Sequence, residues 1–336
     1  MAAAASGSTR LPPRDSALAN GSLRKYLRHI IGGADHDDKR LLTAEDRIQL
    51  LSDWYLSYAD AGSQYSFIVF SKDRPMQLFA LLSSFLKSVH RRCRVIVLYR
   101  GSNDDFTAGY EKCRKLFAPV GDIAFVQQTG ERSFRNDLVD IVDSLSESRL
   151  AFLVDDIVFI RDFDPAVFDA YDLRRHVPSL RLGRTIRYSY AMDKPLNVPA
   201  TVASGGGLLL WTWEGNDVDW AYPLSLDGNI FLRSEMRHLL KRLSFNSPNT
   251  LEGVLQSQND LYLRRKGIAF ELPRLVNIAC NRVQSDAPNR HGNLSAERLL
   301  DEWNRGFAID IDRLRNLEAD SVHVESGLEL RKMDEK

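Results

Sequence analysis

The chain has 336 residues and a mass of 38.2 kDa, enough for one large α/β domain whose core needs no disulfide support. Its 45 Lys and Arg balance 45 Asp and Glu, which argues against nucleic acid as a partner. No apolar run approaches the ~18 residues of a membrane span. Three separated cysteines without a CxxC pair are typical of reduced thiols. We therefore expect a cytoplasmic protein without a transmembrane segment.

The N-terminal residues 1–40 are rich in Ala, Ser, Gly and Pro and are predicted to be disordered or loosely packed. They include a basic amphipathic stretch, which leaves peripheral membrane contact open, and their arginines leave a targeting peptide as an alternative. Residues 41–64 are predicted to contain a helix capped by Thr43. Its apolar stripe, which includes Ile48 and Leu51, is expected to face a core.

From residue 65 onward, short apolar runs alternate with helical patterns, as in βαβ units around a parallel sheet. The predicted strands are residues 66–70, 94–99, 123–126 and 150–154. The predicted helices between them are residues 75–89, 110–117 and 134–145. Further on, the patterns predict helices at 234–243 and 250–266, a strand at 268–272 and a polar C-terminal tail at 311–336. This alternation favours a single large domain with a doubly wound, mostly parallel, Rossmann-like sheet flanked by helices.

Ligands of open α/β sheets bind beyond the carboxyl ends of the strands. After the first predicted strand come Ser71, Lys72, Asp73 and Arg74, at the start of a predicted helix. Backbone amides and two cations there favour a nucleotide or diphosphate, although an ordinary capped turn has the same appearance. Arg100 follows the second strand and is either a nucleotide contact or a solvated loop residue.

The strand at 150–154 ends in two adjacent carboxylates, Asp155 and Asp156. Adjacent carboxylates repel each other and are costly to desolvate, so a position in a cleft favours a compensating cation. Hard oxygen ligands suit Mg²⁺ or Mn²⁺, which would bridge the phosphates of a nucleotide. In the alternative interpretation, only one aspartate faces the cleft while the other caps the next turn.

Several motifs of other enzyme classes are missing from the sequence. No GxGxxG follows the first strand, and the glycines at 205–207 are not followed by GK[ST], so a dinucleotide oxidoreductase and a P-loop enzyme are disfavoured. Four aromatic residues crowd the segment after these glycines and fit either an acceptor surface that stacks on sugar rings or a local core. They are Trp211, Trp213, Trp220 and Tyr222.

Over about residues 65–305 the chain resembles the nucleotide-diphospho-sugar transferases of GT-A fold. The resemblance rests on FIVFSKDRP, on FLVDDIVF in the place of the family's metal-binding DXD element, and on the later segments SLDGNIFLRSEM, NSPNTLEGVL and VNIACNRVQ. It implies a glycosyltransferase that uses Mn²⁺ or Mg²⁺, with a nucleotide-sugar donor and a glycan or glycolipid acceptor. Asp155 and Asp156 align with the metal element, but the sequence reads Asp-Asp-Ile where the family has Asp-X-Asp.

The resemblance also implies a division of labour along the chain. Residues 65–165 would bind the nucleotide sugar, and residues 166–310 would bind the acceptor. Glu252, in the first turn of a predicted helix, stands where inverting members place an acidic base, and Asp227, in a predicted turn, is the second candidate. His291, in the segment after the last predicted strand, would close over the metal as a C-terminal histidine does in some such families.

Two alternatives to a glycosyltransferase remain at this point. A sugar-1-phosphate nucleotidylyltransferase would share the sheet, the metal and the nucleotide, but it should carry a glycine-rich loop with an arginine directly after the first strand, which SKDRP lacks. A non-catalytic protein that binds a sugar nucleotide or a glycan would share the whole pocket.

Overall fold

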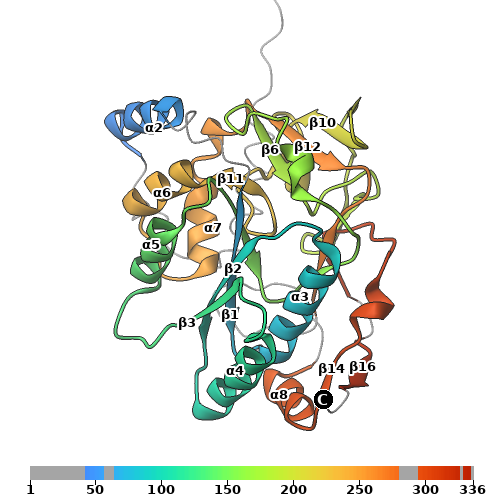
Figure 1. Cartoon of the computed structure of the whole chain (residues 1–336). Coiled ribbons are helices and arrows are strands. Elements are labelled where there is room, and N and C mark those ends of the chain that lie inside the picture. Colours follow the sequence, from blue (N-terminus) through green and yellow to red (C-terminus); the bar gives the residue numbers. More distant parts are fainter. Residues whose placement is uncertain (1–41, 57–63, 280–293, 326–327, 334–336) are drawn as a thin grey trace, which may run out of the picture.

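The computed structural model describes residues 42–56, 64–279, 294–325 and 328–333, with the backbone only at 53–56 (Figure 1). Its centre is a five-stranded sheet with the strand order β11–β4–β1–β2–β3. Four strands are parallel, and β11 runs antiparallel to β4. The strands are β1 (Tyr65–Lys72), β2 (Arg94–Arg100), β3 (Ile123–Gln127), β4 (Arg149–Val154) and β11 (Ile230–Leu232).

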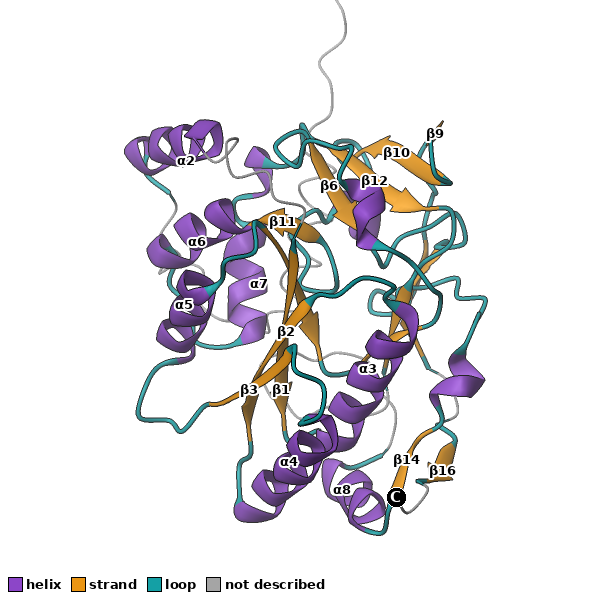
Figure 2. Cartoon of the chain, in the orientation of Figure 1, coloured by secondary structure: helices purple, strands orange, loops and turns teal. Residues whose placement is uncertain are grey.

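Helices cover both faces of this sheet (Figure 2). The chain steps outward from β1 through β2 to β3 and then returns to place β4 on the other side of β1. Because such crossovers are right-handed, the helices before and after the return lie on opposite faces. The helices are α3 (Pro75–Ser88), α4 (Asp104–Phe117) and α8 (Ala296–Asn304) on one face, and α5 (Phe134–Ser144), α6 (Arg233–Arg242) and α7 (Pro248–Gln256) on the other. The predicted fold class, a doubly wound, mostly parallel α/β sheet, is confirmed.

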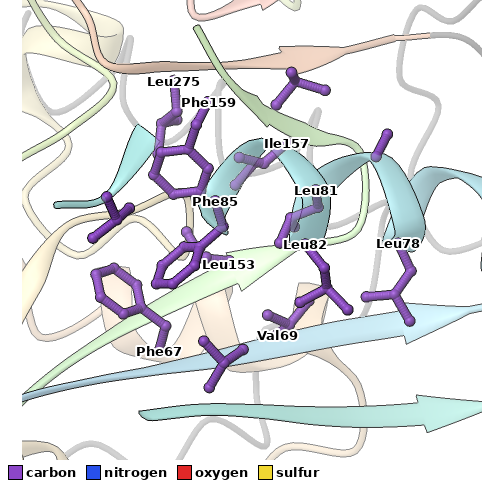
Figure 3. Packing of buried hydrophobic residues seen from close by; sticks show 14 of the residues in the cluster. Phe67, Val69, Leu78, Leu81, Leu82, Phe85, Leu153, Ile157, Phe159 and Leu275 are labelled. Carbon is purple, nitrogen blue, oxygen red and sulfur yellow. The ribbon is translucent and has the colours of Figure 1, made fainter. Parts of the chain in front are cut away.

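Alternate residues of β1 enter two separate hydrophobic cores. Phe67 and Val69 point to the α3 side, whereas Ile68 and Phe70 point to the α5 side. On the α3 side, Phe85 meets Phe67 edge to face at 4.9 Å between ring centroids (Figure 3). Burial on both faces explains why this strand is a continuous apolar run in the sequence.

Two smaller sheets lie beyond the central one. The second has the order β6–β12–β10–β9, and the third has the order β15–β13–β5. Their strands are β5 (Ile157–Phe159), β6 (His176–Ser179), β9 (Val202–Ser204), β10 (Leu208–Thr212), β12 (Lys266–Phe270), β13 (Leu275–Ile278) and β15 (His323–Val324). Only Asp155 and Asp156 separate β4 from β5, so these two carboxylates join the central sheet to the third one.

Four further short strands form two pairs outside the three sheets described above. The predicted C-terminal tail, residues 311–336, contains β15 and β16, and β16 pairs with β14. A small hairpin is formed by β7 and β8. The bounds of these elements are β7 (Tyr188–Ser189), β8 (Lys194–Pro195), β14 (Phe307–Ile309) and β16 (Leu330–Lys332). No helix of the described part of the chain is both long and apolar enough to cross a membrane.

The helix predicted for residues 250–266 is shorter in the structure. It ends at Gln256, and the strand predicted from residue 268 begins at Lys266. Lys266 pairs with Thr212 of β10 and with His176 of β6. Pairing with two strands that are distant in the sequence thus overrides the local helical pattern.

The first described helix, α2 (Ala44–Leu56), is capped as predicted, because Thr43 Oγ1 accepts a hydrogen bond from the backbone N–H of Asp46 at 3.1 Å. The predicted buried stripe is wrong. Ile48 and Leu51 are 69% and 52% exposed, whereas Leu50 is fully buried. The reason is that α2 lies against α6 through polar contacts of Asp46, which turn the Leu50 side of the helix inward.

The aromatic cluster is a core. All four side chains are at most 2% exposed, so the interpretation as a sugar-stacking surface is wrong for them. Trp211 meets Trp213 at 4.8 Å and Trp220 at 5.1 Å, both in edge-to-face geometry. Its indole also covers Gly267 of β12, where an added Cβ would lie 2.1 Å from Trp211 Cε2.

We expect the substitution Gly267→Ala to destabilise the fold by about 1–3 kcal/mol, the usual cost of overpacking a core. The indole cannot move aside because the two neighbouring tryptophans hold it on its other sides. Urea unfolding measures the effect. Gly121→Ala is the control, because an added Cβ meets nothing within 4 Å there. Equal unfolding midpoints for the two variants would contradict this packing.

Candidate active site

The candidate site lies at the carboxyl ends of β1 and β4. These neighbouring strands continue into connections that run in opposite directions, and ligands of open α/β sheets bind at such a switch point. Phe70 and Val154 are partners in the parallel register. The predicted nucleotide turn, residues 71–74, therefore lies beside the predicted metal carboxylates, Asp155 and Asp156.

Asp155 organises the turn after β1. Its Oδ2 accepts hydrogen bonds from Ser71 Oγ at 2.9 Å and from the backbone N–H of Lys72 at 3.1 Å, and its Oδ1 lies 3.0 Å from Arg74 Nη1. The residue is 4% exposed. Both carboxylate oxygens are thus engaged by donors from a single turn of the protein.

Arg74 is the cation that the adjacent carboxylates require. Its Nη1 also reaches Asp156 Oδ2 at 3.5 Å, and the Arg74 and Asp155 side chains are only 11% and 6% exposed. Burial raises the pKa of Asp155, and the guanidinium of Arg74 opposes that rise. Contact between Arg74 and a nucleotide stays a prediction.

The remaining predicted nucleotide residues differ in accessibility. Ser71 and Asp73 are buried, and Asp73 has a left-handed backbone, with φ of 55°. Its Oδ1 accepts the Ser102 N–H at 2.6 Å, which ties the first βα turn to the second. Lys72 and Arg100 are Cα partners at the ends of β1 and β2; Lys72 is partly exposed and Arg100 is exposed. Lys72 and Arg100 are therefore more accessible than Ser71 and Asp73, and their contact with phosphate stays a prediction.

Asn277 of β13 connects the metal candidates with the catalytic candidates. Its Nδ2 donates to Asp156 Oδ1 at 3.1 Å and to Asp227 Oδ1 at 3.3 Å. Asn277 is 2% exposed, and its Oδ1 has no hydrogen-bond partner among the described residues. Sequence reasoning missed this residue, although a lone amide in the apolar stretch Leu275–Ile278 was a signal.

Glu252 and Asp227, the two candidates for the catalytic base, lie close to each other. Glu252 Oε1 accepts a hydrogen bond at 3.1 Å from the backbone N–H of Leu226, which directly precedes Asp227. Burial, and then the charge of Asp227, raise the pKa of Glu252 to about 8. Burial also raises the pKa of Asp227.

An arginine and a histidine near this carboxylate pair were also missed in the sequence. Arg181 is 1% exposed, forms an ion pair with Asp219 at 2.6 Å and lowers the pKa values of both Asp227 and Glu252. His323 of β15, the Cα partner of Asn277, acts on Asp227 in the same direction. Both come from segments with no motif of their own, so only tertiary pairing brings them here.

The fit of a divalent cation rests on Asp156 and Asn277. Asp156 is 19% exposed, and Asn277, whose Nδ2 donates to Asp156, also carries an Oδ1 without a partner among the described residues. No group of three or more His, Cys, Asp or Glu among the described residues is arranged to hold a metal. Such a donor set fits a cation held jointly by the protein and nucleotide phosphates, since Mg²⁺ often keeps only one or two carboxylates. His291 lies outside the described residues.

Comparisons with known proteins give distant likenesses. No family model and no curated protein matches the chain. S. aureus TarS 1-349 is 12% identical over 62% of this chain and 58% of that one, with a TM-score of 0.41, and another of its structures holds UDP-GlcNAc. The mannosyltransferase PcManGT from Pyrobaculum calidifontis, in complex with GDP-Man and Mn²⁺, is 12% identical over 43% of this chain and 48% of its own, with a TM-score of 0.30.

A nucleotidyl transferase from Methanothermobacter, Mth528, is also similar, at 12% identity over 73% of this chain and 99% of its own, with a TM-score of 0.36. The chain thus spans less than two thirds of the length of TarS 1-349 and of PcManGT.

We expect Arg74→Ala to destabilise the protein by about 3 kcal/mol, because it leaves Asp155 as a buried charge without its cation. Urea unfolding measures the loss. Arg92→Ala is the matched control: its ion pair with Asp122 is exposed, with Arg92 83% exposed, and should contribute little. Adding Asp155→Asn to Arg74→Ala should restore part of the stability. An Arg74→Ala variant as stable as the control would show that Asp155 does not need this cation.

The raised pKa of Glu252 predicts that Glu252→Gln is more stable than the wild type by an amount that depends on pH. Between pH 4.5 and about 8 the folded protein keeps a proton on Glu252 that the unfolded chain releases, so this residue costs more stability as the pH rises. Glutamine keeps the neutral form at every pH. The difference in Tm between Glu252→Gln and the wild type should therefore grow from pH 5 to pH 8. A difference that is constant with pH would mean that Glu252 has an ordinary pKa.

Proposed function

We propose that the protein is a glycosyltransferase that moves a sugar from a nucleotide-diphosphate donor to a glycan or glycolipid acceptor with the help of Mn²⁺ or Mg²⁺. The observation that carries the proposal is the hydrogen-bonded chain from Asp156 through Asn277 to Asp227. It links the switch point of the sheet, where a nucleotide is expected, to a pair of carboxylates that are placed to accept a proton.

On the donor side, Lys72 and Arg100 would bind the nucleotide phosphates. The hydrogen bond from the Lys72 N–H to Asp155 fixes the backbone of Lys72. Asp156 and the Oδ1 of Asn277 would hold the divalent cation. A bound cation supplies positive charge to the departing nucleoside diphosphate. Arg74 keeps Asp156 oriented toward this position.

On the acceptor side, Glu252 is the favoured base and Asp227 the alternative. A base works best when its pKa is near the working pH, and Glu252, at about 8, meets that condition. The Leu226 N–H and the Ser225 side chain both form hydrogen bonds with Glu252, which fixes this carboxylate near Asp227. Arg181, which is tied to Asp219, stabilises the charged form of both candidates.

The deciding experiment incubates the purified protein with a panel of UDP- and GDP-sugars and Mn²⁺ and measures the nucleoside diphosphate released. Release with one donor is expected. Pyrophosphate formed from a nucleoside triphosphate and a sugar 1-phosphate would instead show a nucleotidylyltransferase. Binding of a nucleotide sugar without turnover, in the presence of candidate acceptors, would show a non-catalytic binding protein.

Two variants test the metal role of Asp156 and the role of Glu252 as the base. Asp156→Asn should weaken Mn²⁺-dependent binding of nucleoside diphosphate about tenfold or more, as expected for a lost charged ligand, in calorimetric titration. Asp301→Asn, an exposed carboxylate on α8, is its control. Glu252→Gln should cut turnover roughly 10²-fold with donor affinity unchanged. Full turnover in Glu252→Gln together with its loss in Asp227→Asn would exchange the two roles, and unchanged Mn²⁺ dependence in Asp156→Asn would remove the metal assignment.

A further inference from the structure

A pocket lies outside the side-chain cluster of the candidate active site, at the base of the β7–β8 hairpin. It has a volume of about 370 Å³. Two arginines, an amide and two aliphatic side chains line it: Arg184, Arg187, Asn197, Leu196 and Val198. None of these residues takes part in the contacts of the candidate active site.

The backbone that carries the two arginines is fixed at several points. The N–H of Arg184 donates to the carbonyl of Glu271 at 2.8 Å, and the N–H of Arg187 donates to the carbonyl of Asp320 at 2.7 Å. The carbonyl of Arg187 in turn accepts the N–H of Leu196, at 2.7 Å, from across the hairpin. The two cations therefore project from a scaffold held by three segments that are distant in the sequence.

This scaffold also needs the glycine that precedes Arg184. A Cβ on Gly183 would lie 2.7 Å from the backbone nitrogen of Pro273. The N–H of Ile186 closes a turn onto the carbonyl of Gly183 at 3.0 Å, which places Arg184 and Arg187 three residues apart around one turn. The close approach of the two chain segments thus fixes the backbone of the turn that carries both arginines.

The charge of the pocket is positive and available to a ligand. The ion pair of Arg184 with Glu271 is long, at 3.5 Å, and its side chains are 47% and 58% exposed, so it contributes little. Among the described residues, no carboxylate lies within ion-pair distance of Arg187. Two guanidinium groups, with an amide donor from Asn197, match the oxygens of a phosphate group.

The pocket is close to the catalytic candidates along the chain. The N–H of Leu180 donates at 3.2 Å to the carbonyl of Gly228, the residue after Asp227. Arg184 follows Leu180 by four residues, which span at most about 14 Å even when fully extended. A ligand with one end at Glu252 could thus place a charged group on these arginines.

We propose that this pocket binds a phosphate group of the acceptor. The assignment to an acceptor rests on the proposed glycosyltransferase function, whereas the phosphate chemistry rests on the pocket alone. Leu196 and Val198 give the pocket an apolar wall, which suits the carbon skeleton that carries the phosphate. A phosphorylated glycan and the phosphate headgroup of a lipid present the same group.

The test measures phosphate binding by the full chain with two probes. Methyl phosphate in calorimetric titration represents a soluble phosphomonoester. Vesicles of phosphatidylcholine with and without phosphatidic acid, in a sedimentation assay, represent a lipid headgroup. We expect the wild type to bind at least one of them and Arg184→Gln/Arg187→Gln to bind it at least about a hundredfold more weakly, because the double variant loses two charged hydrogen bonds to the phosphate.

Arg264→Gln is the matched control, because Arg264 is also exposed but belongs to the segment that leads into the opposite end of β12. It should bind both probes like the wild type. Binding of methyl phosphate would show that a soluble phosphomonoester is enough for binding to the pocket. Binding of phosphatidic acid vesicles alone would show that the pocket binds the phosphate of a lipid headgroup. No binding of either probe by the wild type, or equal binding by the double variant, overturns the proposal.

Donor hydrolysis separates this proposal from the proposed function. The double variant should release nucleoside diphosphate from the donor as fast as the wild type in the absence of acceptor, because neither arginine contacts the donor residues. If the wild type hydrolyses no nucleotide sugar, the glycosyltransferase proposal fails while the phosphate measurement still decides the pocket. If hydrolysis is normal and phosphate binding is absent, only the pocket assignment fails.

Discussion

The buried carboxylate of Asp155 is the constraint on which the candidate site depends. It directly follows the last residue of β4, and it is held by three donors from the end of β1 and the turn after it: Ser71, Lys72 and Arg74. A charge in this position is stable only while these three donors stay in place. The contacts of Asp155 with Ser71, Lys72 and Arg74 therefore fix the shape of the turn, the direction of Asp156 and the start of α3 at the same time.

The other half of the site comes from segments far away in the sequence. β13 brings Asn277, the turn before β11 brings Asp227, and α7 brings Glu252, which lies beyond the first turn of that helix. Burial makes each carboxylate costly to ionise, and their closeness adds to that cost. Such an arrangement destabilises the protein and is typical of groups that are kept for chemistry.

The sequence predicted the central sheet well because its strands are buried on both faces and its helices have one apolar face each. The closeness of Asp155 to Arg74 also followed from the sequence, since the ends of neighbouring parallel strands meet at one edge. The role of Asn277 did not, because it depends on strand pairing across more than a hundred residues. Composition could not decide whether Trp211 and its neighbours bind sugar or form a core, because both uses select the same aromatic side chains.

The two-residue connection between β4 and β5 has a mechanical consequence. β4 belongs to the central sheet, β5 belongs to the third sheet, and the carbonyl of Asp156 accepts the N–H of Ile278 from β13 at 2.7 Å. With only two residues between them, the two sheets cannot shift far relative to each other without breaking the hydrogen bond between Asp156 and Ile278. Any larger opening that admits a ligand would therefore involve segments away from this joint.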